Sequence, residues 1–192
     1  IATVLGTLAA LGLSRPQMPF KAIIMSILIS PMIVPLIITA AGMFFFYAKV
    51  NLVYTFTGII LAHVALSTPF VVITVTATLV GFDTDMTKAA QSLGARPIRT
   101  FFKVIMPLIL PGVIAGALFA FITSFDEVVI VMFMASLNEL TIPKQMWAGI
   151  RQEISPVILC MATCLVAFSI FLLTTVELLR RRSEKMRGIT AR

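Results

Sequence analysis

The chain has 192 residues, of which 59% are hydrophobic and only 12% carry a charge. A soluble domain carries about 25% charged residues, so this composition excludes an ordinary soluble protein and indicates a membrane protein. The net charge of +7 does not indicate a nucleic-acid partner, because the basic side chains lie at the ends of apolar runs.

The apolar runs predict an all-α, polytopic fold. A helix that crosses the hydrocarbon core needs about 20 apolar residues. Residues 1–13 are too few, so they are expected to be the inner end of a span whose beginning is missing. Complete spans are expected over residues 22–46, 52–80, 112–134 and 156–179. Together they predict one transmembrane domain that ends in a polar tail, residues 180–192.

Proline predicts bends in the first two complete spans. Pro31 and Pro35 are expected to bend the span over residues 22–46, and Pro69 the span over residues 52–80. The backbone groups that a proline leaves unpaired can be satisfied by hydroxyl side chains or by neighbouring helices. Both segments are therefore still expected to cross the membrane.

The longest interruption between the apolar runs covers residues 81–111 and begins with a short predicted helix. Asp83 or Asp85 is expected to cap its start, because a short acceptor side chain satisfies free N–H groups there. Gly94 is expected to end it through a left-handed backbone conformation. Its narrow apolar face is formed by Met86, Ala89, Ala90 and Leu93.

A second short helix is expected to begin at Pro97, where the missing N–H of proline costs nothing. Pro107 and Pro111 are expected to break the entry into the next apolar run. The apolar face of this helix is formed by Ile98, Phe101, Phe102 and Ile105.

The spacing of small residues and proline across residues 81–111 resembles the cytoplasmic signature loop of permease subunits in binding-protein-dependent ABC importers. The family pattern is roughly Glu-Ala-Ala, three residues, Gly, nine residues, Ile-x-Leu-Pro. The spacing agrees throughout, but Lys88 stands where the family usually has Glu, and Val104 and Met106 replace Ile and Leu. The residues at the signature positions are Lys88, Ala89, Ala90, Gly94, Val104, Met106 and Pro107.

This resemblance covers nearly the whole chain and implies a type I importer-like permease fold in a bacterial inner membrane. It implies that residues 83–111 contact a separate ATPase, that a second permease subunit completes the pathway, and that a solute-binding protein delivers the solute. The sequence has no phosphate-binding G-x-x-x-x-G-K-[ST] motif and only one histidine. The chain is therefore not expected to be an enzyme or to hold a cofactor.

The basic residues predict the orientation in the membrane. The segments on one side hold 12 of the 15 lysines and arginines, and the segments on the other side hold Lys49, Lys144 and Arg151. Basic residues concentrate in cytoplasmic loops, so residues 81–111 and the C-terminus are expected in the cytoplasm. This prediction does not depend on the family resemblance.

Asp126 and Glu127 follow Ser124 and Phe125 in an otherwise apolar run. One unpaired carboxylate at the bilayer centre costs about 2.5–3.5 kcal/mol, so the two are not expected to face lipid. They either line a pathway for cationic solutes or are structural residues bonded to helix ends. This segment resembles the spermidine/putrescine-type branch of the permease family, which implies a polyamine solute.

Other residues within the apolar runs are expected to be structural. Gly112, Gly116 and Ala120 form a small-xxx-small face for close helix packing. His63 is expected to bond to a neighbouring helix, and Trp147 to lie in the outer aromatic belt, with a contact to a docking protein as the alternative.

Three further hypotheses remain at this point. The first is an ABC permease for another small solute, such as an amino acid or a metal ion. The second is a secondary transporter, but the sequence lacks the repeats and ion-coupling residues that such a protein needs. The third is a membrane scaffold, which the acidic pair and the loop spacing disfavour.

Overall fold

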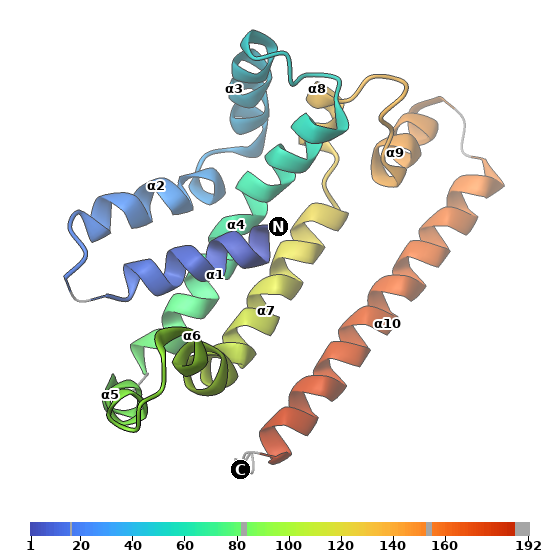
Figure 1. Cartoon of the computed structure of the whole chain (residues 1–192). Helices are drawn as coiled ribbons and strands as arrows, with labels where there is room; N and C mark the ends of the chain where they lie inside the picture. The colour runs from blue at the N-terminus through green and yellow to red at the C-terminus, as the bar shows by residue number, and fades with distance from the viewer. Residues whose placement is uncertain (16, 82–83, 153–154, 187–192) are drawn as a thin grey trace. The chain divides into compact units, whose positions relative to one another are not determined.

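The computed structural model describes residues 1–15, 17–81, 84–152 and 155–186, and all secondary structure in this part of the chain is helical (Figure 1). The chain folds as two compact units, Ile1–Thr141 and Ile142–Arg192. By length and composition, three described helices can cross a membrane, or four if a sharply bent pair forms one span. The all-α fold predicted from the sequence is confirmed.

The centre of the first unit is a pair of helices, α4 (Phe56–Val80) and α7 (Met106–Phe125), with α1 (Ala2–Leu13) packed against both. The small residues Gly112 and Gly116 of α7 lie directly on α4, where Val71 is fully buried. The small-xxx-small face of α7 therefore serves packing within the chain. Close backbone approach of this kind is how apolar helices associate where water supplies no hydrophobic driving force.

One continuous helix joins the 81–111 segment to α7. It begins as α6 (Pro97–Thr100), passes through a π-helical turn, η1 (Phe101–Ile105), and continues as α7, giving a 29-residue helix. The expectation that Pro107 and Pro111 break the entry into this helix is wrong. Each proline removes one hydrogen bond, but in apolar surroundings only a helix satisfies the remaining backbone groups. The π turn ends at Ile105, two residues before Pro107.

The expected span over residues 22–46 corresponds to two helices, α2 (Lys21–Ile33) and α3 (Leu36–Lys49), whose axes are bent by 108°. Val34 between them has an extended backbone, with ψ of 135°. The ring of Pro35 disfavours the α conformation in the residue before it. Pro31, in contrast, lies inside α2 without ending it.

The end of α7 is followed by a short helix, α8 (Val129–Met134), which packs against α3. The expected span over residues 112–134 is thus formed by α7 and α8, with residues 126–128 between them. Ile130, Val131 and Met134 of α8 form a buried cluster with side chains of α3 and α4.

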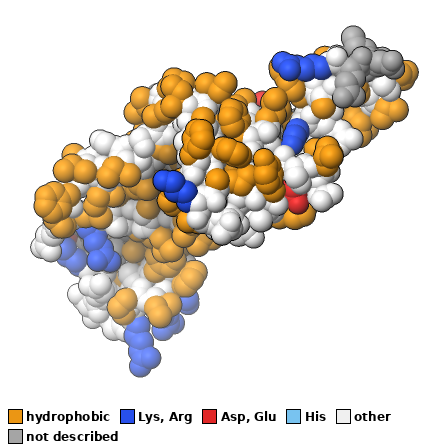
Figure 2. All heavy atoms as spheres, turned by 90° about the horizontal axis from the view of Figure 1, so that it is seen from above, with side chains coloured by type: hydrophobic (Ala, Val, Ile, Leu, Met, Phe, Trp, Pro, Cys, Tyr) orange, Lys and Arg blue, Asp and Glu red, His pale blue; other side chains and the backbone are white. Residues whose placement is uncertain are grey.

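The second unit contains α9 (Ile142–Gln152) and α10 (Pro156–Met186). Gly149 of α9 lies against Ile158 of α10. Residues 156–175 of α10 are long and apolar enough to cross a membrane. Hydrophobic side chains also cover much of the face of the molecule seen in Figure 2.

Candidate functional site

The 81–111 segment forms a compact turn between two helices at one end of the α4–α7 pair (Figure 1). Its first helix is α5 (Thr84–Ser92), and Gly94 follows with a φ of 80°. The N–H of Gly94 donates to the carbonyl of Gln91, and that of Ala95 to the carbonyl of Ala90. These two bonds are the Schellman arrangement, so the predicted left-handed helix end at Gly94 is confirmed.

The start of α5 is only partly described. Asp85 lies in the first turn of the helix, where a carboxylate is favoured by the helix dipole. Asp83, the other expected cap, lies outside the described residues.

Four of the large apolar side chains on the two faces of this segment are exposed. Leu93 is 89% exposed and Ile98 is 74% exposed, and Met86 and Phe102 are also exposed. These exposed apolar side chains are accessible to a partner surface.

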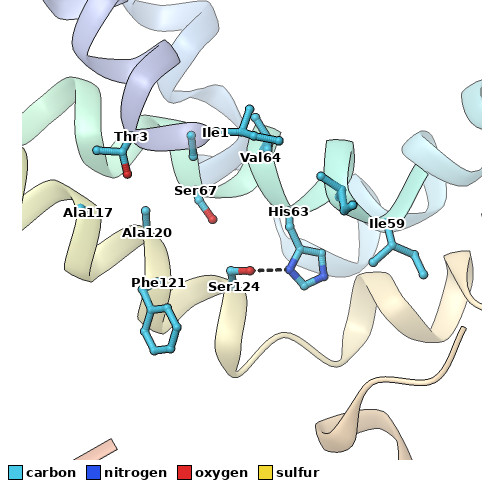
Figure 3. Close-up of a pocket in the computed structure, with 12 residues that line it drawn as sticks. Ile1, Thr3, Ile59, His63, Val64, Ser67, Ala117, Ala120, Phe121 and Ser124 are labelled. Carbon is cyan, nitrogen blue, oxygen red and sulfur yellow. Dashed lines mark hydrogen bonds between the residues drawn. The ribbon is translucent and has the colours of Figure 1, made fainter. Parts of the chain in front are cut away.

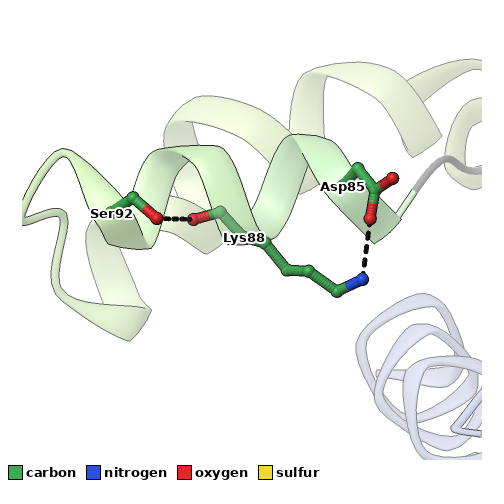
Figure 4. A network of polar contacts seen from close by, with 3 residues as sticks. All are labelled: Asp85, Lys88 and Ser92. Carbon is green, nitrogen blue, oxygen red and sulfur yellow. Dashed lines mark hydrogen bonds and ion pairs between the residues drawn. The ribbon is translucent and has the colours of Figure 1, made fainter.

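Lys88, which stands where the family pattern usually has Glu, lies on the outer surface of α5 (Figure 4). Its ammonium group forms an ion pair with Asp85 at 2.7 Å, and both side chains are well exposed. The Oγ of Ser92 donates to the backbone carbonyl of Lys88. An exposed pair of this kind contributes at most about 1 kcal/mol, so Lys88 is free to exchange Asp85 for another acidic partner.

The signature positions divide into two groups. Lys88, Ala89 and Gly94 are exposed on α5 and its end, whereas Val104 lies in the π turn. Met106 packs against the core formed by α1, α4 and α7. Pro107 follows it in the first turn of α7. The first group thus belongs to the accessible surface, and the second joins that surface to the helix pair.

Asp126 and Glu127 have different environments. Asp126 ends α7 and its side chain is exposed. Glu127 is only 5% exposed, and its Oε1 accepts a hydrogen bond from the N–H of Ile130. Because the first N–H groups of a helix lack partners within it, Glu127 is held as an acceptor at the start of α8. Asp126 is left as the accessible carboxylate of the pair.

The exposed Asp126 borders a cleft of about 610 Å³. One side of this cleft is formed by the break between α2 and α3, including Val34 and Pro35, and another by Leu66 and Phe70 of α4. Its remaining lining is mostly apolar, and Asp126 and Glu127 are its charged residues. A carboxylate in an apolar cleft favours a cationic ligand, because the low local dielectric strengthens the attraction.

A second pocket lies between α1, α4 and α7, and its lining includes the expected structural histidine (Figure 3). The Nδ1 of His63 and the Oγ of Ser124 are 2.8 Å apart, so the predicted bond between His63 and a neighbouring helix is confirmed. Ser67 also lines this pocket. No motif or spacing in the sequence indicates a role for Ser67.

Within the described residues, no group of three His, Cys, Asp or Glu side chains is arranged to hold a metal ion. Three features of the described residues are candidate binding sites: the exposed apolar side chains of the 81–111 segment, the carboxylate of Asp126 in its cleft, and the pocket around His63.

Comparison with known proteins gives a consistent result. The family described as "Binding-protein-dependent transport system inner membrane component" matches residues 2–185. The spermidine/putrescine transport system permease protein PotC of Haemophilus influenzae is 30% identical over 184 residues, which are 96% of this chain and 72% of that protein. PotC of Escherichia coli K12 is 30% identical, over 98% of this chain and 71% of its own length.

Two further matches extend this comparison. The putrescine transport system permease protein PotI of Escherichia coli K12 is 29% identical, over 86% of this chain and 61% of its own length. Among solved structures, a chain of the MetNI methionine ABC transporter in an inward facing conformation superposes with a TM-score of 0.67. It covers 99% of this chain and 88% of its own length at 19% identity, which supports a shared fold.

Proposed function

Because the chain belongs to the family of binding-protein-dependent transport system inner membrane components, we propose that it is a pathway subunit of an ATP-driven polyamine importer. The relatives named for spermidine and putrescine transport match nearly its whole length. A diamine or triamine is a flexible cation with an alkyl backbone, and the cleft at Asp126 combines a carboxylate with apolar walls. The exposure of Asp126 beside the buried Glu127 is the observation that carries this proposal.

In this proposal the 81–111 segment docks onto a separate ATPase. The exposed apolar side chains Leu93, Ile98 and Phe102 support this assignment, because they need a partner surface to leave water. Hydrolysis of ATP belongs to that partner. A second permease subunit completes the pathway, and a solute-binding protein delivers the polyamine on the opposite side.

The proposed orientation places the 81–111 segment and the C-terminus in the cytoplasm. It rests on the 12 basic residues of these segments and of residues 14–21, against three on the other side. Asp126 then lies in the outer half of the membrane, because α7 runs from the cytoplasmic segment towards it. A cation arriving from outside meets this carboxylate early in its passage.

The two acidic residues have separate roles in this proposal. Asp126 compensates the charge of an ammonium group as it leaves water, and Glu127 holds the start of α8 in place. The Glu127 carboxylate borders the same cleft, but it is largely buried and accepts a hydrogen bond from the N–H of Ile130, so its first role is to hold α8. The substitutions Asp126→Asn and Glu127→Gln remove one charge each while keeping the shape of the side chain.

The test is uptake of radiolabelled putrescine by the complete transporter in proteoliposomes. Asp126→Asn should lower uptake at least tenfold, since a charge-assisted hydrogen bond contributes about 1.5–3 kcal/mol, and the complex should still assemble. Glu127→Gln should weaken assembly or thermal stability more than it lowers the uptake of each intact complex. Wild-type polyamine uptake by Asp126→Asn would refute the role of Asp126, and transport of an anion by the intact system would refute the polyamine assignment.

A further inference from the structure

Helix α9 has one apolar side and one polar side that carries two basic residues. At 3.6 residues per turn, four of its large apolar side chains fall within an arc of about 140°. They are Ile142, Met146, Trp147 and Ile150. Lys144 and Arg151 are seven residues apart, so they lie almost in line along the helix, just beyond the Trp147 edge of this arc. Such a pattern is typical of a helix that lies in the plane of a membrane interface.

The apolar side of α9 is largely open. Ile142 is 45% exposed, Trp147 is 46% exposed and Ile150 is 53% exposed. At one edge of this side, Gly149 lies against Ile158 of α10. The helix is therefore attached to α10 along one edge, and its exposed apolar side chains are accessible to a covering layer.

The contact with α10 places α9 at the end of a candidate membrane span (Figure 1). The apolar stretch of α10 begins at Pro156, so Ile158 belongs to its first turn. A residue that touches the first turn of a span lies close to the boundary between hydrocarbon and headgroups. At this level, lipid is the apolar material that can cover Ile142, Trp147 and Ile150.

Trp147 and Arg151 form a cation–π pair at this boundary. The guanidinium carbon of Arg151 lies over the indole ring, 5.6 Å from its centroid, which is within the usual limit of about 6 Å. Tryptophan is enriched at the headgroup level of membranes. The N–H donors of a guanidinium lie in its plane, so a ring below that plane leaves them directed sideways, where they suit a phosphate group.

The charge of α9 also favours an anionic surface. The sequence of the helix contains Lys144 and Arg151 but no Asp or Glu. Of the two acidic residues that flank it in sequence, Glu139 accepts a hydrogen bond from the N–H of Ser136 at 3.2 Å, and Glu153 lies outside the described residues. Two positive charges on one polar side complement negatively charged headgroups.

We propose that α9 is an interfacial helix that binds an anionic phospholipid. Arg151 holds the headgroup phosphate, Lys144 adds a second positive charge two turns away, and the acyl chains cover Trp147 and Ile150. Phosphatidylglycerol has this chemistry, whereas phosphatidylcholine carries a compensating positive charge on its headgroup. The binding of lipid at α9 does not depend on which solute the transporter carries.

The test is quenching of Trp147 fluorescence by lipids brominated on their acyl chains. Trp147 is the one tryptophan of this sequence, and the difference in emission between the complete transporter and its Trp147→Phe variant isolates its signal from those of other subunits. Nanodiscs of phosphatidylcholine receive equal fractions of brominated phosphatidylglycerol or brominated phosphatidylcholine. The apparent affinity at Trp147 should be at least about fivefold higher for phosphatidylglycerol, since each basic residue near an anionic surface contributes about this factor.

Arg151→Gln removes one charge from the polar side of α9, and Arg151→Lys is the matched control that keeps it. Arg151→Gln should lower the preference for phosphatidylglycerol about fivefold, whereas Arg151→Lys should largely retain it. Quenching by brominated phosphatidylcholine should be the same in both variants, because Trp147 still meets acyl chains. High salt should weaken the preference of the wild type, because it screens charges at a surface.

Two results would overturn the proposal. Equal quenching of wild-type Trp147 by the two brominated lipids, or an unchanged preference in Arg151→Gln, would show that α9 does not select an anionic headgroup. Absence of quenching by either lipid would show that Trp147 does not meet acyl chains, and would favour a protein surface as the cover of α9.

Discussion

Replacement of Gly116 by alanine should push α7 slightly away from α4 and lower the stability of the protein. A Cβ at Gly116 would lie 2.8 Å from the Cα of Val71 and closer still to the Oγ1 of Thr74. Carbon atoms pack best at about 3.5–4.0 Å, so the helices must move apart by about 1 Å. Val71 is fully buried and its Cα belongs to the backbone, so no side-chain rotation relieves the clash. Overpacking of this kind costs about 1–3 kcal/mol.

Gly42→Ala is the control, because a Cβ at Gly42 of α3 meets nothing within 4 Å. Thermal unfolding of both purified variants in detergent measures the difference. With about 2–4 °C of Tm per kcal/mol for a chain of this size, Gly116→Ala should unfold about 2–12 °C below wild type. Gly42→Ala should remain within about 2 °C of wild type, since surface substitutions change stability by about 0.5 kcal/mol. Equal midpoints for the two variants would refute the assigned α4–α7 contact.

Two other predictions concern the 81–111 segment. Gly94→Val places a β-branched residue at a φ of 80°, which costs about 1–2 kcal/mol. This variant should insert into the membrane normally, but its co-purification with the ATPase and its solute uptake should fall. Normal uptake and normal stimulation of the ATPase would contradict this prediction. With Cys160 and Cys164 replaced, an impermeant thiol reagent should label Gln91→Cys only from the cytoplasmic side and Gln145→Cys only from the outside. Labelling of Gln91→Cys from outside would reverse the orientation and remove the proposed ATPase contact.

Local chemistry explains the features that the sequence predicted. The left-handed end of α5 at Gly94 depends on a single residue type, and the bond between His63 and Ser124 follows from the need of a polar side chain in an apolar run. The permease family was predicted from the loop spacing and is confirmed by the match over residues 2–185. These features depend on neighbours in sequence or on one strong physical requirement.

Tertiary contacts explain the features that the sequence did not predict. Proline is expected to break a helix when only its local effect is considered. The helix continues through Pro107 and Pro111 because its surroundings are apolar, and the local sequence does not show those surroundings. Helical periodicity places Asp126 and Glu127 about 100° apart, but it does not say which side chain meets α8. That answer required the position of the N–H of Ile130, which depends on where α8 begins.

The continuous helix from Pro97 to Phe125 has a mechanical consequence. At 1.5 Å per residue its 29 residues measure about 43 Å, with the exposed Ile98 near one end and Asp126 directly after the other. No loop interrupts this helix, so a displacement at the first end passes to the second through continuous helical backbone. The π turn at Phe101–Ile105 is the irregular stretch of this helix, so a change in its winding would rotate α7 relative to α6. Asp126, which follows α7, would then rotate towards or away from its cleft.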